Sequence, residues 1–185
     1  MDSSGNHNMY YIALVCPPET NKKIEQFKLW MKEQFGCIVA LKSPGHITLI
    51  PPFWLDNTRE ATLQETLQSF KASLGNLKIE LDGFSHFNKR VLFVQVKENL
   101  QMEKLQKQAD EHFKQSFSDA IRKDQLPFHA HVTIANRDMK PFHFEMAWQY
   151  FSVKEFHEKF FIKTISLLRL NMGKWGVIGE KEWEE

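Results

Sequence analysis

In the first half of the chain, the spacing of apolar residues alternates between that typical of strands and that typical of helices. Residues 9–15 form an apolar run that predicts a buried strand, and the prolines at 17–18 end it. Residues 20–35 then predict a helix with one apolar stripe, which Gly36 closes. This stripe consists of Ile24, Phe27, Met31 and Phe35. Residues 37–41 are again apolar and predict a short strand.

A second group of elements follows a Ser-Pro-Gly turn at 43–45. Strict alternation over residues 46–49 predicts a strand with one buried face, and the prolines at 51–52 predict its end. A capping-box pattern at 57–60 opens the next predicted helix. Its apolar positions are Leu63, Leu67, Phe70 and Leu74. Residues 77–84 predict a further strand.

The same order of elements recurs in the second half of the chain. A strand at 91–96 precedes a helix that Asn99 caps, and a polar connection at 118–128 leads to a second alternating strand from residue 131. The inward positions of this helix are Met102, Leu105, Ala109, Phe113 and Phe117. A short helix, a strand and a hairpin complete the pattern, at residues 142–150, 156–162 and 165–178.

The repeated order predicts an α+β protein of two lobes related by pseudo-two-fold symmetry. Antiparallel or mixed sheets should line a central groove, with the helices outside. No linker separates the halves, so we expect residues 9–180 to form a single bilobal domain. The polar residues 1–8 predict a flexible tail, and residues 181–185 predict an acidic, solvated C-terminal tail.

The two alternating strands carry the same four-residue pattern. Residues 46–49 read His-Ile-Thr-Leu, and residues 131–134 read His-Val-Thr-Ile. Side chains two positions apart on a strand share a face, so each copy presents an imidazole beside a hydroxyl. Two such strands facing each other would place two imidazoles and two hydroxyls in one cleft. This set suits phosphate ester chemistry, with one His as base, one as acid, and the hydroxyls on phosphate oxygens.

The charge balance excludes a general polyanion-binding surface. The 24 basic and 23 acidic residues give a net charge of +1, so we expect no binding along extended duplexes. No apolar run approaches the length of a membrane span, and the N-terminal residues lack a signal-peptide pattern. Cys16 and Cys37 are too few for a disulfide framework and favour buried thiols in the reducing cytoplasm.

With these motifs, the chain resembles the 2H phosphoesterase superfamily, which includes bacterial 2′-5′ RNA ligases and 2′,3′-cyclic nucleotide phosphodiesterases. The copies at 46–49 and 131–134 match the defining His-x-Thr signature of that family. Residues 81–94 resemble the segment between its motifs, and the resemblance extends from residue 9 to about 180. It implies a bilobal fold and a His/His site that needs neither a metal nor another cofactor.

The resemblance also implies roles for four residues. His46 and His131 correspond to the general acid and base, and Thr48 and Thr133 correspond to phosphate ligands. The implied partner is a nucleotide or an RNA terminus that carries a cyclic phosphate. We expect a monomer that binds no membrane.

The chain departs from the family pattern around the second motif. Many members have Pro directly before the second His, where this chain has Ala130. Many carry a basic residue five positions after that His, whereas here Asn136 stands there and Arg137 comes one later. A shift of one residue on a strand moves a side chain to the other face, so the role of Arg137 depends on where the strand ends.

Other residues near the motifs admit two interpretations. His129 beside His131, with His86 or His143, suggests a metal site, but the set lacks Cys and well-spaced carboxylates, which favours a hydrogen-bonding role for His129. Four aromatic residues flank the motif strands and suit either base stacking or core packing. They are Phe53, Trp54, Phe87 and Phe128.

The sequence therefore predicts a metal-independent phosphoesterase that opens 2′,3′-cyclic phosphates on RNA ends or nucleotides. Reversible 2′-5′ RNA ligation would use the same groups in the opposite direction. A third hypothesis is a module that binds an RNA end without turnover.

Overall fold

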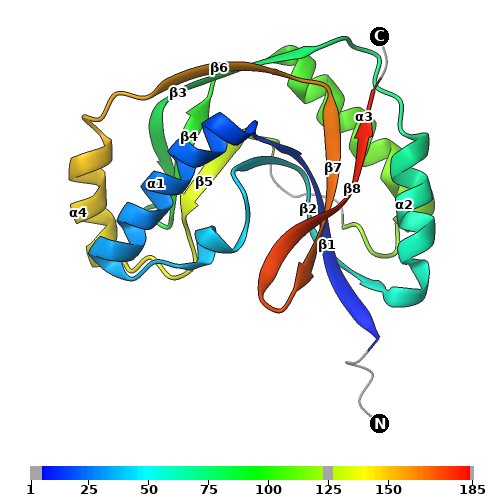
Figure 1. Cartoon of the computed structure of the whole chain (residues 1–185), viewed down its shortest axis with the longest axis horizontal. Helices are drawn as coiled ribbons and strands as arrows, with labels where there is room; N and C mark the ends of the chain where they lie inside the picture. Colours follow the sequence, from blue (N-terminus) through cyan, green and yellow to red (C-terminus); the bar gives the residue numbers. More distant parts are fainter. Residues whose placement is uncertain (1–5, 123–126, 184–185) are drawn as a thin grey trace.

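Two four-stranded antiparallel sheets form the framework of the computed structural model, which describes residues 6–122 and 127–183 (Figure 1). In the first sheet the order is β2-β1-β7-β8, with β1 at His7–Val15, β2 at His46–Asp56, β7 at Thr164–Asn171 and β8 at Lys174–Glu182. In the second sheet the order is β5-β4-β3-β6, with β3 at Leu77–Phe87, β4 at Val91–Val96, β5 at His131–Ala135 and β6 at His157–Ile162. The predicted α+β class with two sheets is confirmed, and all strand pairs are antiparallel.

The helices are exchanged between the lobes. Helix α1 (Pro18–Phe35) connects two strands of the first sheet but packs on the second, together with α4 (Pro141–Phe151) (Figure 1). Helix α3 (Leu100–Phe117) connects two strands of the second sheet but packs on the first, beside α2 (Glu60–Ser69). Each sheet is therefore covered by a helix that connects two strands of the other sheet.

Aromatic contacts fix this exchange. On α1, the Phe27 ring lies 5.1 Å from that of Phe84 in β3 and 5.0 Å from that of Phe156 (centroid distances). On α3, the Phe113 ring lies 6.5 Å from that of Phe70, which follows α2. One cluster of buried apolar side chains accordingly includes residues of both sheets and of the four helices. The two lobes share a single core.

Helix α3 follows the sequence prediction closely. The Asn99 side chain accepts hydrogen bonds from the backbone amides of Gln101 and Met102, as a cap does. The five predicted inward positions are at most 1% exposed. Helix α2 begins differently, because Asp56 accepts from the Thr58 amide and a short 3-10 turn, η3 (Asn57–Arg59), precedes the helix.

Helix α2 ends at Ser69, before the predicted helical positions Phe70 and Leu74. Two predictions about strands were also wrong. Residues 37–41 form no strand, because the Asp138 carboxylate accepts from the Ile38 and Val39 amides (2.6 and 2.9 Å) and a 3-10 helix, η2 (Val39–Lys42), follows. The prolines at 51–52 do not end β2, which continues to Asp56. β2 is an edge strand, so a proline can lie in it without removing a needed ladder hydrogen bond.

The ends of the chain are more ordered than their composition suggested. In the predicted tail at 1–8, His7 and Asn8 already pair with β2. In the predicted tail at 181–185, β8 runs to Glu182 and Trp183 is 3% exposed, because its indole packs into the core and donates to the Gly75 carbonyl. Residues 1–5, 123–126 and 184–185 of the predicted tails and connection lie outside the described residues.

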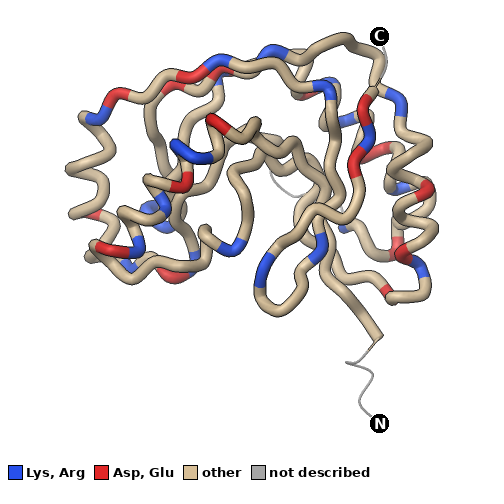
Figure 2. The backbone as a smooth tube through the Cα atoms, in the orientation of Figure 1, with Lys and Arg blue, Asp and Glu red and all other residues tan. Residues whose placement is uncertain are grey.

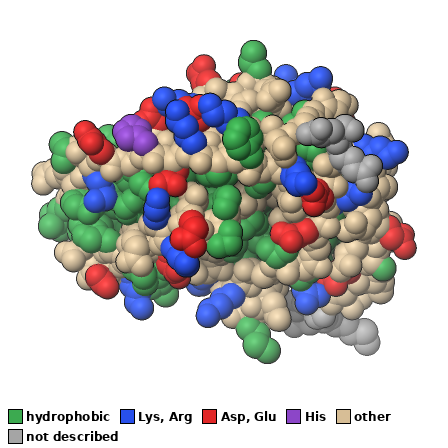
Figure 3. All heavy atoms as spheres, turned by 45° about the horizontal axis from the view of Figure 1, so that its top comes forward, with side chains coloured by type: hydrophobic (Ala, Val, Ile, Leu, Met, Phe, Trp, Pro, Cys, Tyr) green, Lys and Arg blue, Asp and Glu red, His purple; other side chains and the backbone are tan. Residues whose placement is uncertain are grey.

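Charged side chains of both signs are interspersed over the lobes (Figure 2). On the face shown in Figure 3, which includes β3 and β6, lysines neighbour carboxylates. Lys78 and Lys159 both approach Glu80, and Lys97 lies 3.0 Å from Asp82. The described residues of this outer face therefore form no continuous basic track. None of the helices in the described residues is both long and apolar enough to cross a membrane.

Candidate active site

The two His-x-Thr strands meet between the lobes. β2 and β5 are edge strands of their sheets, and they contact each other. In both motifs the apolar residues are at most 1% exposed, whereas His46, Thr48, His131 and Thr133 are partly exposed on the opposite face. The predicted alternation of buried and exposed positions is confirmed in both copies.

Both imidazoles are held in the same way. Nδ1 of His46 lies 2.8 Å from the carbonyl oxygen of Pro44, and Nδ1 of His131 lies 2.7 Å from that of His129. In each motif, the carbonyl two residues upstream therefore accepts a hydrogen bond from Nδ1–H. The neutral ring then carries its proton on Nδ1 and leaves Nε2 free to accept one.

Burial lowers the pKa of both histidines. The pKa of His46 falls to about 4, chiefly because burial outweighs the opposing effect of the hydrogen bond to Pro44; the charges of Lys28 and His131 lower it further. The pKa of His131 is also lowered, chiefly by burial; the hydrogen bond to the His129 backbone opposes this effect, and the electrostatic influence of His129 adds to it. Without a bound anion, we expect both imidazoles to be mainly neutral near pH 7.

Two adjacent open cavities share the lining residues Thr48 and Pro52, and together they are called the groove. The first, of about 360 Å³, is lined by His46, Thr48 and Thr133 among others. The second, of about 410 Å³, is lined by Thr48 and His131 among others. The four predicted site residues thus line these two adjoining cavities, with Thr48 common to both.

Tyr11 is a groove residue that the sequence did not single out. Its ring centroid lies 4.8 Å from that of His46 and 4.6 Å from that of Trp175. Burial raises the pKa of Tyr11, so its hydroxyl stays protonated. Residues 9–15 gave no hint of this role because the run is apolar on both faces. The pairing of Val15 with His46 shows that Tyr11, four residues before Val15, faces the groove.

The position of Arg137 is settled by where β5 ends. The strand stops at Ala135, and the Met139 amide donates to the Asn136 carbonyl to form a turn. Side chains alternate between the two faces only within the strand, and Arg137 lies beyond its end. Arg137 can therefore line the same cavity as Thr133, as it does. Lys42 lines it too, so the groove contains two cationic side chains.

His129 contributes to the site through its backbone. Its carbonyl holds His131, while its ring makes an edge contact with Phe87 and lines the second cavity. His86 packs on Phe144 and Trp148, away from this pair. Within residues 6–122 and 127–183, no three His, Cys, Asp or Glu side chains are grouped as metal ligands.

The flanking aromatic residues divide between groove and core. Phe87 and Phe128 line the second cavity beside His131. Phe53 is 5% exposed and belongs to the core cluster. Trp54 is 58% exposed and lines another depression, beside Arg122. Two of the four therefore remain candidates for contact with a base.

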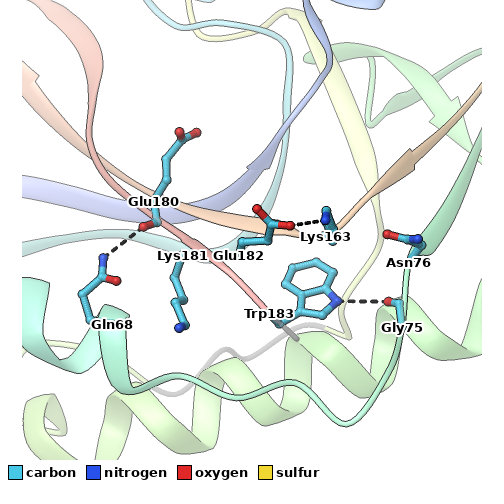
Figure 4. A pocket seen from close by; sticks show the side chains of 8 residues that line it. All are labelled: Gln68, Gly75, Asn76, Lys163, Glu180, Lys181, Glu182 and Trp183. Carbon is cyan, nitrogen blue, oxygen red and sulfur yellow. Dashed lines mark hydrogen bonds and ion pairs between the residues drawn. The ribbon is translucent and has the colours of Figure 1, made fainter. Parts of the chain in front are cut away.

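A further cavity, of about 550 Å³, lies at the outer edge of the first lobe (Figure 4). Trp183 and Gln68 line it, and each donates a hydrogen bond to a backbone carbonyl. Lys163 and Glu182 form an ion pair across it. None of the motif residues lines this cavity, which separates it from the candidate active site.

Comparisons with known proteins agree on the family and the fold. The model of the 2′-5′ RNA ligase superfamily matches residues 16–174. Among solved structures, TT0787 of Thermus thermophilus is 15% identical with a TM-score of 0.66, over 96% of this chain and 100% of that one. E. coli LigT complexed with 3′-AMP is 14% identical with a TM-score of 0.64, over 97% and 99%. LigT complexed with NADP+ is 15% identical with a TM-score of 0.65, over 98% and 100%. No curated protein sequence matches. At these identities the structural likeness shows the fold alone.

Proposed function

The chain belongs to the 2′-5′ RNA ligase superfamily, and from that premise we propose that it is a metal-independent phosphoesterase that opens 2′,3′-cyclic phosphates on RNA ends or nucleotides. The observation that carries the proposal is the meeting of two identically held imidazoles in one groove. Phosphoester transfer needs one group to accept a proton and another to donate one, and such a pair supplies both.

In the proposed reaction, water attacks the phosphorus of the cyclic phosphate. One imidazole takes a proton from water through Nε2 as the new P–O bond forms. The other, protonated, donates from Nε2 to the ribose oxygen as its bond to phosphorus breaks. The product is a ribose phosphomonoester, and the two histidines end with exchanged protonation states. Their Nδ1 hydrogen bonds keep both rings oriented throughout.

The groove also suits the charge that develops on the phosphate. The hydroxyls of Thr48 and Thr133 can donate to non-bridging oxygens, whose charge grows in the transition state. Lys42 and Arg137 line the same cavity and add positive charge there. Because the two threonines are held on β2 and β5, their hydroxyls need little rearrangement when the substrate binds.

A nucleobase fits the second cavity by its chemistry. Phe87 and Phe128 line it together with Leu49, Pro51 and Pro52, so it is mainly apolar. Aromatic rings hold bases by stacking without reading their sequence. Structures of LigT with 3′-AMP, NADP+ and ATP show that this relative takes nucleotides. We place the base of the substrate beside Phe128, with its phosphate between the histidines.

Ligation is a second candidate activity, favoured by the family to which the chain belongs. A 5′-hydroxyl of RNA would replace water as the nucleophile, and a 2′-5′ diester would form. The same two histidines would transfer the protons. A chain that bound RNA ends without either reaction would use the groove as a binding module.

Turnover of adenosine 2′,3′-cyclic phosphate with and without EDTA tests the proposed function. We expect hydrolysis to a single adenosine phosphomonoester at a rate that chelation leaves unchanged. Loss of activity in EDTA would indicate a metal-dependent hydrolase. Binding of the phosphomonoester, with no turnover of either an RNA end or the cyclic nucleotide, would indicate a binding module.

The pH dependence of kcat/KM should be bell-shaped and displaced to acid. The base must be deprotonated and the acid protonated, and both histidine pKa values are lowered from 6.5, that of His46 to about 4. Activity should therefore be lost below the acidic limb near pH 4 and lost again above a basic limb that lies below pH 6.5. The limbs describe the pair rather than either residue. A profile with both limbs above pH 6.5 would contradict this account of the free enzyme.

A further inference from the structure

Lys28 is a buried cation without an acidic partner. It is the one charged side chain that is buried among the described residues, at 3% exposed. Its Nζ donates to the Ser43 carbonyl at 2.9 Å, and it forms no ion pair within the described part of the chain. An ammonium group has three donors, and a buried charge that lacks an anion is costly. Lys28 therefore places a positive charge, which no ion pair in the described residues neutralises, next to the turn that precedes His46.

Lys28 lines a cavity that adjoins the candidate active site. This cavity, of about 440 Å³, lies between the start of α1 and the turn at 43–45. It shares Lys42, Ser43 and Trp175 with the groove cavity that contains His46. The two cavities therefore share part of their lining, so a ligand in the groove lies next to the basic cavity.

The cavity is strongly basic. Lys22, Lys28, Lys42 and Lys174 line it, against one lining acid, Glu25; Lys22 also pairs with Glu19, at 3.0 Å. The basic positions come from α1, from the loop between α1 and β2, and from the β7–β8 hairpin, and Figure 2 marks basic residues on each of these segments. Such a concentration stands out in a chain whose net charge is only +1. Lysine ammonium groups bind phosphate as compact point charges.

We propose that this basic cavity is a second anion subsite, which binds a phosphate of the substrate other than the one that reacts. The proposal rests on the proposed function and specifies its substrate class. The substrate would carry at least two phosphates, as a nucleotide with a 5′-phosphate does, or as the last two nucleotides of an RNA do. A nucleoside with only a 2′,3′-cyclic phosphate would leave the subsite empty.

The protonation of the groups around Lys28 agrees with an anion there. Burial lowers the pKa of Lys28 to about 8, which still leaves it mainly protonated at pH 7. The neighbouring Cys16 thiol has its pKa raised by burial to about 12, so it supplies no negative charge. Glu25 is the acid whose charge reaches Lys28 along α1, yet the two form no ion pair in the described residues. An incoming phosphate would stabilise the protonated amine.

A purely structural role for Lys28 makes a different prediction. Its bond to Ser43 supports the turn that precedes His46, so Lys28→Met could weaken every ligand equally. Lys174 is exposed on the hairpin and has no such role. If both Lys28→Met and Lys174→Ala lose the preference for a ligand with a second phosphate, the lysines form the subsite. If Lys28→Met alone loses affinity, and loses it equally for all ligands, Lys28 only supports the turn.

Calorimetric titration with phosphomonoester products tests the proposal without requiring turnover. The ligands are adenosine 2′-monophosphate, adenosine 2′,5′-bisphosphate, and a diadenosine 3′-5′ dinucleotide with a terminal 2′-phosphate. We expect the protein to bind one of the two larger ligands at least about tenfold more tightly than the monophosphate, in keeping with one additional charge-assisted contact. Whichever is preferred identifies the source of the second phosphate.

The variants decide whether that preference arises in the basic cavity. The ratio of affinities should fall to within about threefold of unity in Lys174→Ala and in Lys28→Met, as expected when a charge-assisted contact is lost. The matched control Lys104→Ala removes the same charge from an exposed position on α3 and should keep the wild-type ratio. The proposal would be overturned if the wild type showed no preference for a second phosphate, or if that preference survived in Lys174→Ala and in every folded Lys28→Met sample.

The subsite and the proposed reaction can fail separately. Turnover of adenosine 2′,3′-cyclic phosphate without a preference for a second phosphate would refute the subsite alone. Such a preference without turnover would refute only the proposed reaction.

Discussion

Replacing either motif histidine with alanine is expected to reduce the turnover number for a 2′,3′-cyclic nucleotide by about 10²-fold or more, the usual effect of losing a general acid or base. The double variant His46→Ala/His131→Ala should fall well short of the product of the two single effects, because the residues act as one unit. Rates of the four proteins under saturating substrate provide the measurement.

Two histidines outside the proposed proton transfer serve as controls. His129→Ala keeps the backbone carbonyl that holds His131, so it should lose far less activity than His131→Ala. His157 is exposed on β6, and His157→Ala should remain close to the wild type. An undiminished rate in His46→Ala or His131→Ala would remove that residue from the mechanism.

Truncation of Phe113 should destabilise the whole protein by about 3–5 kcal/mol, the range for deleting a buried phenyl ring. Phe113 is fully buried on α3, the helix that the second half of the chain contributes to the first lobe. Since both lobes share one core, the loss should appear as a single shifted transition. Urea unfolding followed by circular dichroism and by tryptophan fluorescence measures it.

The exposed residue Leu100 provides the control on the same helix. It is 82% exposed, so Leu100→Ala should change the free energy of unfolding by no more than about 0.5 kcal/mol. Two separate transitions in Phe113→Ala, one for each lobe, would show that the exchanged helices do not couple the halves. A loss below about 1 kcal/mol would show that the ring is not packed as described.

Much of the local structure follows from the sequence because its causes are local. Alternation over 46–49 and 131–134 correctly identified which motif side chains are buried and which face the groove. Asn99 and the apolar stripe that follows it correctly identified α3. The residues at 43–45 correctly predicted that the chain turns there, just before the strand that begins at His46. In each case, side-chain spacing along one element decides the outcome.

Features that depend on distant partners were not predictable in this way. An apolar stripe shows that a helix packs on a sheet but not on which of the two sheets. The exchange of α1 and α3 between the lobes was therefore not predicted. The apolar run at 37–41 became a 3-10 helix because a carboxylate about 100 residues away, that of Asp138, binds its amides. Trp183 was assigned to a solvated tail, since nothing near it indicated its bond to Gly75.

The candidate site shows the same division. The four motif residues could be named from their repetition, but Tyr11 needed the register of β1 against β2, and Arg137 needed the end of β5. The basic cavity draws its residues from three separate segments. No stretch of the sequence is basic enough to reveal it.

A crystal structure of the protein with adenosine 2′-monophosphate is the most direct test of the central claim, that the two motifs form one phosphate site. We expect the phosphate to lie between His46 and His131, within hydrogen-bond distance of both Nε2 atoms and of the hydroxyls of Thr48 and Thr133. A phosphate bound elsewhere, or one that only a single histidine contacts, would contradict the account.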